Sequence, residues 1–188
     1  MKDIALTGLA RSGKDSVATR LVEHHGYVRV AFADKLKEAA LKADPIIAAI
    51  PTWDGDGCHF YRLSQIVNEL GWEAAKDDFP EVRRFLQCYG QTVREIDPRF
   101  WINAAKPAIE AAWASGRPVV VTDVRYTNEA DFLHGSLPFG LVRVTRPGQT
   151  PGDHISEREM LDYTADLTIV NAGTLEYLSS LADALVKR

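Results

Sequence analysis

The chain has 188 residues, of which 46% are hydrophobic and 26% charged, and its formal net charge is −4. This length and composition predict one globular domain with a full hydrophobic core. The acidic balance argues against a general nucleic-acid binder. The sequence shows neither an apolar run of membrane-spanning length nor a signal-peptide pattern, so we expect a cytoplasmic protein without a membrane partner. Cys58 and Cys88 are too few for a disulfide framework or a zinc site, and we expect two buried or idle thiols.

The first elements of the chain predict a phosphate-binding loop. Residues 4–7 are apolar, as in a buried strand, and apolar residues recur at helical spacing after residue 16. Between them the sequence reads Gly8-Leu9-Ala10-Arg11-Ser12-Gly13-Lys14-Asp15-Ser16. The Gly-x-x-x-x-Gly-Lys spacing in this context is that of a P-loop. Its glycines let backbone N–H groups converge on phosphate oxygens, the helix N-terminus favours the same anion, and Lys14 and Arg11 supply positive charge.

One position departs from the usual P-loop. The residue after the lysine is ordinarily Ser or Thr, whose hydroxyl binds magnesium, but here Asp15 stands there and the hydroxyl follows at Ser16. A carboxylate beside a triphosphate is repelled unless a cation lies between them. We therefore expect Asp15 to hold the magnesium shell or to pair with a basic residue.

The remaining chain predicts alternating strands and helices. Over residues 44–61 the pattern dissolves into Pro, Gly, Asp and scattered aromatic residues and predicts neither helix nor strand, and within it Asp54–Gly57 predicts a solvated loop. Periodicity predicts strands over 27–32, 119–123, 141–145 and 167–170, and helices over 35–43, 63–75, 82–89, 100–114, 128–133 and 175–185. Continuous apolar strands separated by helices indicate an α/β fold with about five parallel strands covered on both faces.

Two charged residues lie where the valine-rich strand ends. Asp123 is its last residue and Arg125 follows shortly after, at the carboxyl edge where ligands of parallel sheets bind. We expect Asp123 to hold a magnesium-bound water and Arg125 to bind a phosphate in bidentate fashion. The alternative is a structural Asp–Arg pair.

The polar segment 149–163 predicts a mobile cover. Arg146, just before it, and Arg158, within it, are candidates for neutralising transferred phosphoryl oxygens on closure. A hydrolase site made of His154, Ser156 and Glu157 is less favoured, because the sequence lacks the sharp nucleophile turn of such enzymes.

A series of segments in this order resembles the phage-type deoxynucleoside monophosphate kinases of the P-loop nucleoside monophosphate kinase superfamily. The segments are Arg11–Ser16, Phe32–Lys37, Arg84–Gln87 with Gly90 and Trp101, Thr122–Arg125, Arg146–Gln149, His154–Glu157 and Ile169–Leu175. The resemblance covers nearly the whole chain. In that family the Asp after the loop lysine is normal, and Ser16 replaces the usual Thr.

The resemblance implies the P-loop NTPase fold as one domain over 1–188, with a helical substrate-binding insertion over 44–116 and a lid over 147–163. It also implies an enzyme that transfers the γ-phosphoryl of ATP, with Mg²⁺, to deoxynucleoside 5′-monophosphates. The diphosphates would serve DNA precursor synthesis, in the host cytoplasm if the chain is of phage origin. A homodimer stays an open alternative to a monomer.

The resemblance also assigns residues. The residues expected at the ATP phosphates and adenine are Arg11, Ser12, Gly13, Lys14, Asp15, Ser16, Asn171 and Gly173. Those expected to hold magnesium are Asp15, Ser16 and Asp123, and those facing the acceptor are Ala33, Lys37, Arg84, Gln87, Asp123 and Arg125. The catalytic set is Lys14, Asp15, Arg125 and Arg146. Arg83, Arg94 and Arg99 stay open as alternatives to Arg84.

Three other classes fit parts of the pattern. Small P-loop kinases that act on dephospho-coenzyme A or phosphomevalonate share these motifs, and only substrate assays separate them. A non-catalytic nucleotide-binding module needs fewer arginines than these separate segments carry. A GTP-binding switch requires an Asn-Lys-x-Asp motif, which the sequence lacks.

Overall fold

The computed structural model describes residues 2–187 and divides into two compact units. The first, here called the P-loop unit, comprises Met1–Phe32 and Trp101–Arg188, and the second, the inserted unit, comprises Ala33–Phe100. The sequence predicts one domain with an insertion over 44–116. The inserted unit instead takes in nearly all of α2 (Phe32–Ala43) and leaves out nearly all of α5 (Phe100–Ala114).

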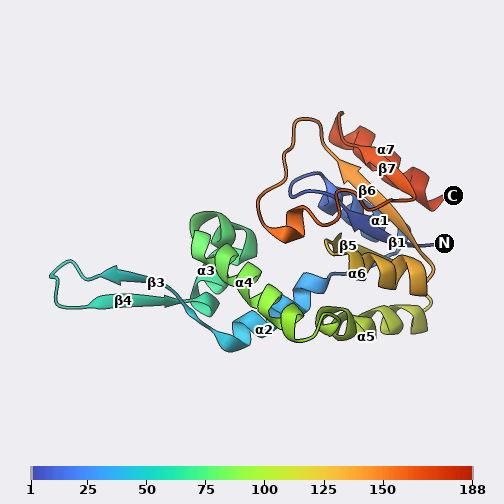
Figure 1. Cartoon of the computed structure of the whole chain (residues 1–188). Coiled ribbons are helices and arrows are strands. Elements are labelled where there is room, and N and C mark those ends of the chain that lie inside the picture. The colour runs from blue at the N-terminus through green and yellow to red at the C-terminus, as the bar shows by residue number, and fades with distance from the viewer. Residues whose placement is uncertain (1, 188) are drawn as a thin grey trace. The chain divides into compact units, whose positions relative to one another are not determined.

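The P-loop unit is built on a five-stranded parallel sheet, as the sequence predicts (Figure 1). The strand order is β2–β5–β1–β6–β7. The strands are β1 (Asp3–Thr7), β2 (Val28–Val30), β5 (Val119–Val124), β6 (Phe139–Thr145) and β7 (Leu167–Val170). Central β1 pairs with β5 on one side and β6 on the other, Ile4 lying opposite Val120 and Gly140.

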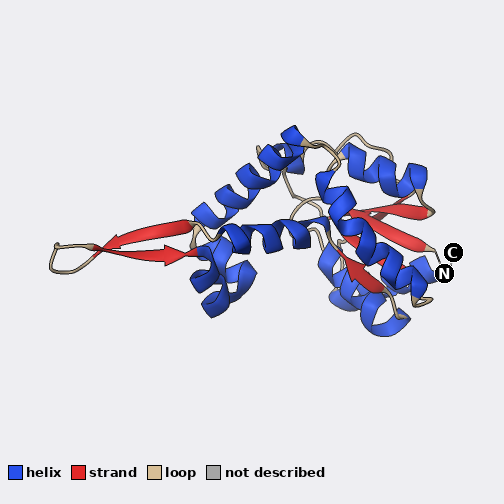
Figure 2. Ribbon diagram, turned by 90° about the horizontal axis from the view of Figure 1, so that it is seen from below, coloured by secondary structure: helices blue, strands red, loops and turns tan. Residues whose placement is uncertain are grey.

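Helices cover both faces of this sheet (Figure 2). Successive side chains of a strand point to opposite faces, so Ile4 and Leu6 enter one core and Ala5 the other. The first core is closed by α1 (Lys14–His25) and α7 (Leu175–Val186), and the second by α5, α6 (Thr127–Ala130) and the π-helical turn Asp131–Ser136. Burial on both sides explains why the strands read as continuous apolar runs.

A charged cluster ties α1 to α7. The Asp183 carboxylate accepts hydrogen bonds from Arg20 Nε at 2.8 Å and Nη2 at 2.9 Å, and lies 2.8 Å from His25 Nε2. These partners, Arg20 first, hold the pKa of Asp183 well below its usual range. The ionised carboxylate thus links the two helices that cover one face of the sheet.

The inserted unit combines three helices and a hairpin. Its elements are α2, β3 (Ile46–Pro51), β4 (Cys58–Arg62), α3 (Leu63–Asp78), which is kinked at Gly71, and α4 (Pro80–Ile96). Its core contains Ala40, Ile47, Leu63, Ile66, Ala75, Val82 and Leu86. A Cβ built on Gly90 would lie 3.0 Å from Leu36 Cδ2, so α2 and α4 approach closely there.

The sequence predicts neither helix nor strand over residues 44–61, and here the structure differs. Most of this segment is an antiparallel hairpin, in which Ala49 pairs with Phe60 and Pro51 with Cys58 (Figure 2). The solvated loop predicted at Asp54–Gly57 is confirmed as the exposed tip of this hairpin, where Thr52 N donates to Gly57 O at 2.8 Å. Of the two states expected for the thiols, buried or idle, the structure excludes burial, because Cys58 and Cys88 are both free and exposed.

Among the residues described, no helix combines the length and apolar character needed to cross a bilayer.

One buried carboxylate joins the starts of two strands to a helix. Asp3 is 9% exposed; its Oδ1 accepts from Val119 N at 2.6 Å and its Oδ2 from Trp113 Nε1 at 2.8 Å. Each carboxylate oxygen therefore has its own donor, one on β5 and one on α5.

Asp3→Asn should lower the free energy of unfolding by about 1–3 kcal/mol, because the new amide NH2 group faces one of these donors and leaves it unsatisfied. Urea unfolding measures the difference. The control Asp162→Asn changes an exposed side chain and should stay within about 0.5 kcal/mol of the wild type. Equal stability of Asp3→Asn and the control would contradict this role of Asp3.

Candidate active site

The loop between β1 and α1 has a backbone that side chains disfavour. Gly8 has φ +138°, and a Cβ there would lie 2.1 Å from Val144 O. Gly13 has φ +106°, and a Cβ there would lie 2.6 Å from Asn171 Nδ2. Both glycines are therefore required, by conformation and by close approach of neighbours. Arg11 also has a positive φ, 60°, so the loop turns back on itself as the motif predicts.

Lys14 folds back over this loop. Its Nζ donates to Gly8 O at 2.7 Å and Leu9 O at 2.6 Å, and the residue is only 6% exposed. Burial, followed by the positive charge of Arg125, lowers the pKa of Lys14 from 10.5 to about 8; Asp15, Glu157 and Asp123 act in the opposite direction. The ammonium thus lies in a cluster of charges at the strand ends.

A cavity of about 340 Å³, here called the P-loop cavity, gathers three segments that are distant in sequence. The predicted residues that line it are Arg11, Gly13, Asp15, Ser16, Arg146, Asn171 and Gly173. Ser12 is fully buried, and Lys14 forms the first residue of α1. The residues expected to bind ATP thus lie in one loop or around one cavity.

Asn171 supports the loop directly. Its side-chain Nδ2 donates to Ser12 O at 3.0 Å, while its backbone N donates to Thr145 O at 2.7 Å. The sequence predicts Asn171 beside adenine, whereas its amide in the structure holds the backbone of the P-loop. Asn171 therefore links the end of β7 to the P-loop.

The segment 147–163 contacts the P-loop at two points. Gln149 Nε2 donates to Ala10 O at 2.8 Å, and Ala10 N donates to Glu157 Oε2 at 3.3 Å. The same segment is held further along, where Thr127 N and Oγ1 donate to Glu159 Oε1 at 2.7 and 2.8 Å. The predicted cover is therefore hydrogen-bonded to both the P-loop and α6.

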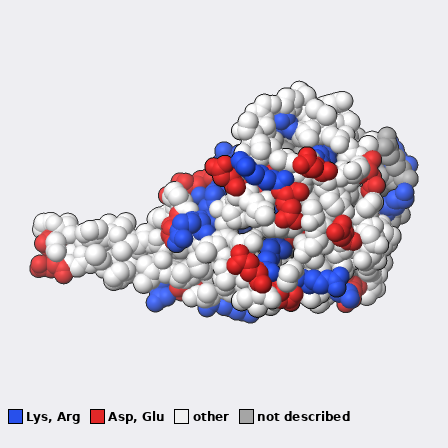
Figure 3. All heavy atoms as spheres, in the orientation of Figure 1, with Lys and Arg blue, Asp and Glu red and all other residues white. Residues whose placement is uncertain are grey.

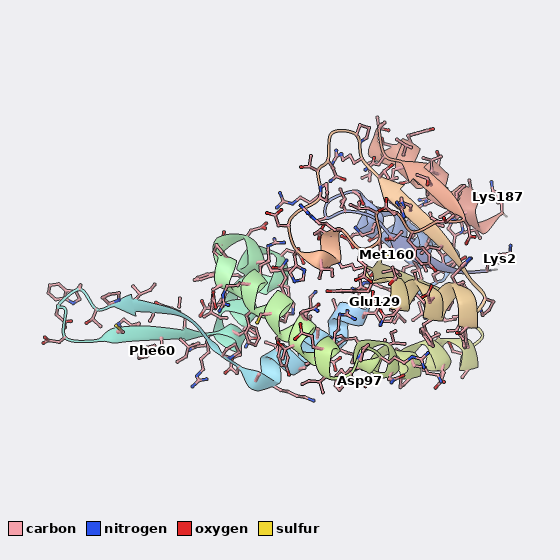
Figure 4. The ribbon with its side chains drawn as sticks, viewed as in Figure 1. Lys2, Phe60, Asp97, Glu129, Met160 and Lys187 are labelled. Atoms are coloured by element: carbon pink, nitrogen blue, oxygen red, sulfur yellow. The ribbon has the colours of Figure 1, made fainter. Side chains whose placement is uncertain are left out.

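Arg125 is held by two glutamates. Its guanidinium forms an ion pair with Glu157, and its backbone N donates to Glu129 Oε2 at 2.9 Å. Glu129, labelled in Figure 4, is 1% exposed and also accepts from Tyr126 N at 3.2 Å. The sequence predicts that Arg125 binds a phosphate or forms a structural pair with Asp123. In the structure its guanidinium pairs with Glu157.

The strand-end aspartate has a structural contact. Asp123 Oδ1 accepts a hydrogen bond at 2.9 Å from the backbone N of Phe32, the first residue of α2. A carboxylate at a helix N-terminus is favoured by the helix dipole. This contact engages one of the two oxygens of the group predicted to hold a magnesium-bound water.

The remaining predicted acceptor residues belong to the inserted unit. Ala33 and Lys37 lie one turn apart on α2, and Arg84 and Gln87 one turn apart on α4. Lys37 Nζ lies 5.5 Å from the centre of the Trp72 ring, and Arg84 Nη2 lies 2.6 Å from Glu81 Oε1. These residues therefore stand on a different unit from Asp123 and Arg125.

The neighbouring arginine Arg83 pairs with another carboxylate, at 3.3 Å from Asp77 Oδ1. Arg158, predicted as a lid charge, donates hydrogen bonds within its own segment to Gly152 O at 3.0 Å and Asp153 Oδ1 at 2.9 Å.

The hydrolase site considered for His154, Ser156 and Glu157 is not formed. His154 Nδ1 lies 2.9 Å from Ser156 Oγ, but the Glu157 carboxylate pairs with Arg125.

The donors around the P-loop cavity fit magnesium. Within the described residues no group of three or more His, Cys, Asp or Glu side chains is arranged to hold a metal. Asp15 and Ser16 instead offer two hard oxygen donors at the cavity. Mg²⁺ is usually held in this way, by one or two protein oxygens together with substrate phosphates.

The architecture is similar to that of a solved kinase. An unliganded sugar kinase from Janibacter sp. HTCC2649 superposes with a TM-score of 0.52 at 13% identity, over 100% of this chain and 95% of that one. At this identity the likeness concerns the fold alone. The fold and the loop together define the chain as a P-loop NTPase-type fold.

The family follows from the sequence relatives. The profile of the family described as deoxynucleotide monophosphate kinase matches residues 50–181. The deoxynucleotide monophosphate kinase of Enterobacteria phage T4 is 23% identical, over 96% of both chains. A protein of Acanthamoeba polyphaga mimivirus, provisionally named for the same activity, is 29% identical over 92% of this chain and 90% of its own. The chain belongs to the deoxynucleotide monophosphate kinase family, and the resemblance stated from its motifs is confirmed.

Sequence reasoning missed three contributors to the site. Glu129 carried only half of a capping-box signal, because it lies three residues after the helix N-cap, but that N-cap is Tyr126 and not Ser, Thr, Asp or Asn. The contacts of Gln149 and Glu157 with Ala10 join residues more than a hundred positions apart and had no local signal.

The Lys14 amine should titrate near pH 8, well below the ordinary lysine value of 10.5, in nitrogen- or carbon-detected NMR, with Lys14→Met providing the assignment. Because the folded pKa lies below 10.5, the fold carries a charged, buried ammonium below pH 8. This cost to stability should fade as pH rises from about 8 toward 10.5. Titration of Lys14 above pH 10 would contradict the burial argument.

The charge of Glu157 raises the pKa of Lys14, so Glu157→Gln should lower it further. Glu176→Gln, an exposed change on α7, is the matched control and should leave it unchanged. An unaltered Lys14 pKa in Glu157→Gln would show that the two groups are not coupled.

Proposed function

We propose that this phosphotransferase moves the γ-phosphoryl of ATP to the 5′-phosphate of deoxynucleoside monophosphates. Membership of the family and the acceptor named for its phage T4 relative support this substrate class. The observation that carries the proposal is the P-loop cavity, where the P-loop, Arg146 and the segment after β7 converge.

We assign the ATP side to this cavity. Backbone N–H groups of residues 11–16 and the N-terminus of α1 would bind the phosphates, with Arg11 and Lys14 as the positive charges. Asn171 and Gly173 would border the base, and Arg146 would stack on it or clamp a phosphate. To reach a phosphate, Lys14 would exchange its carbonyl partners Gly8 and Leu9 for phosphate oxygens.

Asp15 and Ser16 would hold Mg²⁺, with Asp123 contributing through a bound water. When bound, the ion neutralises charge on the phosphate oxygens. Of these groups, Asp15 and Ser16 line the P-loop cavity.

We assign the acceptor phosphate to Arg125, together with Ala33, Lys37, Arg84 and Gln87 of the inserted unit. Arg125 would turn from the Glu157 carboxylate to the acceptor phosphate, exchanging one anion for another. An oxygen of the acceptor phosphate attacks the γ-phosphorus, and the bond to the β–γ bridging oxygen breaks to release ADP. The attacking oxygen of the acceptor phosphate is ionised at neutral pH, so positioning and charge neutralisation suffice without a strong base.

The first test is a coupled ADP-release assay with ATP, magnesium and a panel of acceptors. The panel holds the common deoxynucleoside monophosphates, their ribonucleotide counterparts, dephospho-coenzyme A and phosphomevalonate. We expect turnover on deoxynucleotides and little on the rest. Turnover on one of the last two acceptors alone would overturn the substrate, and ATP binding without turnover on any acceptor would overturn the enzyme.

Lys14→Ala and Arg125→Ala should each lower kcat/KM by about 30- to 1,000-fold, because each removes a charge that stabilises the transferring phosphates by about 2–4 kcal/mol. Steady-state kinetics with circular dichroism as a folding check measures this. Lys106→Ala, an exposed lysine on α5, is the matched control and should keep full activity. Near-wild-type turnover by Lys14→Ala would contradict the assignment of Lys14 to the transferring phosphates.

A further inference from the structure

Glu157, in the cover of residues 147–163, contacts two groups that the proposed reaction reserves for phosphates. Its Oε2 accepts a hydrogen bond from Ala10 N at 3.3 Å, and its carboxylate forms an ion pair with the guanidinium of Arg125. Ala10 directly precedes the loop N–H groups that we assign to ATP, and Arg125 is assigned to the acceptor phosphate. One carboxylate therefore touches both sides of the reaction, although the proposed function gives it no role.

The carboxylate satisfies these donors as a phosphate would. Both anions accept hydrogen bonds through oxygens that share a negative charge, and both pair with a guanidinium. The Glu157 oxygens are divided between the two partners, Oε1 with Arg125 and Oε2 with Ala10, and the side chain is only 17% exposed. Arg125 is therefore neutralised before a ligand arrives, and an incoming phosphate has to displace an anion.

The charge of Glu157 also acts on Lys14. Burial lowers the pKa of Lys14 to about 8, and the Glu157 carboxylate is one of the groups that oppose this shift. On the face of the P-loop unit visible in Figure 3, acidic and basic atoms are intermixed, so their long-range fields partly cancel. The balance of charges close to Arg125 and Lys14 therefore has a large influence on how tightly a phosphate binds.

A cavity beside the Arg125–Glu157 pair offers room for a phosphate. It has a volume of about 150 Å³ and lies between the cover, the P-loop and the ends of β5 and β6. Its lining includes Gly8, Leu9, Arg125, Ser156 and Glu157. A single water molecule needs about 10–15 Å³ by the same measure, so a phosphate group fits. A phosphate in this cavity would reach Arg125 once the Glu157 carboxylate has withdrawn.

The far end of the cover is held by other contacts. Arg143 Nη2 donates to Met160 O at 2.6 Å, and Arg143 Nη1 donates to Leu161 O at 2.5 Å. These bonds join the cover to β6 and involve neither the P-loop nor Arg125. The Glu157 carboxylate can therefore withdraw while the far end of the cover stays in place.

We infer that Glu157 is an internal substitute for phosphate, which occupies phosphate-binding groups of the free enzyme and is displaced when a substrate phosphate binds. The inference rests on the proposed function for the identity of the substrates. Glu157 is a positioning residue, because it acts through Arg125 and the P-loop and forms no bond to the transferred group. The apparent affinity for a ligand falls with the fraction of protein that is ready to bind it, so the carboxylate lowers the affinity for phosphate.

The test is the affinity of the full chain for inorganic phosphate, measured by isothermal titration calorimetry at constant ionic strength. Glu157→Gln removes the competing charge and should tighten phosphate binding at least about fivefold, the lower end of the usual range for coupled equilibria. The gain should vanish when Arg125→Ala is added, because it depends on the released guanidinium.

The matched control is Gln149→Ala, which removes the second contact of the cover with the same loop residue, from Gln149 Nε2 to Ala10 O at 2.8 Å. This variant keeps the charge of Glu157, so its affinity for phosphate should equal that of the wild type. Circular dichroism and the unfolding midpoint establish that each variant is folded.

Unchanged or weaker phosphate binding by Glu157→Gln would assign the carboxylate to support of Arg125 and overturn the inference. Equal tightening by Glu157→Gln and Gln149→Ala would also overturn it, because loosening of the cover rather than charge would then set the affinity. The calorimetry requires no turnover. A kinase assay that fails on every deoxynucleotide would therefore overturn the proposed acceptor, while tighter phosphate binding by Glu157→Gln alone would still support the substitute.

Discussion

The hydrogen bonds from the buried Lys14 ammonium to the carbonyls of Gly8 and Leu9 are the interaction on which the site depends. They require the loop to pass close to the lysine, which only glycine at positions 8 and 13 permits. Burial makes the charged amine costly, and this cost lowers its pKa to about 8. A phosphate that replaces the carbonyls would return this energy as binding, because an anion favours the charged form. The loop is thus built to hold positive charge at a place where only an anion fully compensates it.

The carboxylate of Glu157 contacts both the P-loop and Arg125. Glu157 accepts from Ala10 N in the loop and pairs with Arg125 at the end of β5, so one anionic side chain joins two groups that suit a phosphate. The Glu129 carboxylate fixes the backbone of Arg125 by accepting a hydrogen bond from its N–H group. This arrangement neutralises the arginine and also seats the cover on the loop. Binding at Arg125 and movement of the cover would therefore be coupled, since both break the same contact.

Local patterns predicted most of the sheet, and long-range contacts explain what they missed. Helix α5 matches its predicted bounds because an alanine-rich run ends at Gly116 and Pro118. The β3–β4 hairpin was missed because its strands lack the usual one-sided alternation, both faces being exposed. The P-loop residues were predicted from their spacing, and the cavity brings them together with Arg146 and Asn171. The bond from Asn171 to Ser12 and the pairing of Arg125 with Glu157 depend on tertiary packing, which no local pattern encodes.

Transfer of the γ-phosphoryl to a deoxynucleoside monophosphate is the central claim, and isotope tracing tests it most directly. ATP labelled with ¹⁸O in the non-bridging oxygens of its γ-phosphoryl would be incubated with the chain, magnesium and a deoxynucleoside monophosphate, and the products analysed by mass spectrometry. We predict a deoxynucleoside diphosphate whose terminal phosphoryl carries the whole label. Label found only in inorganic phosphate, with the acceptor unchanged, would mean hydrolysis and would contradict the claim.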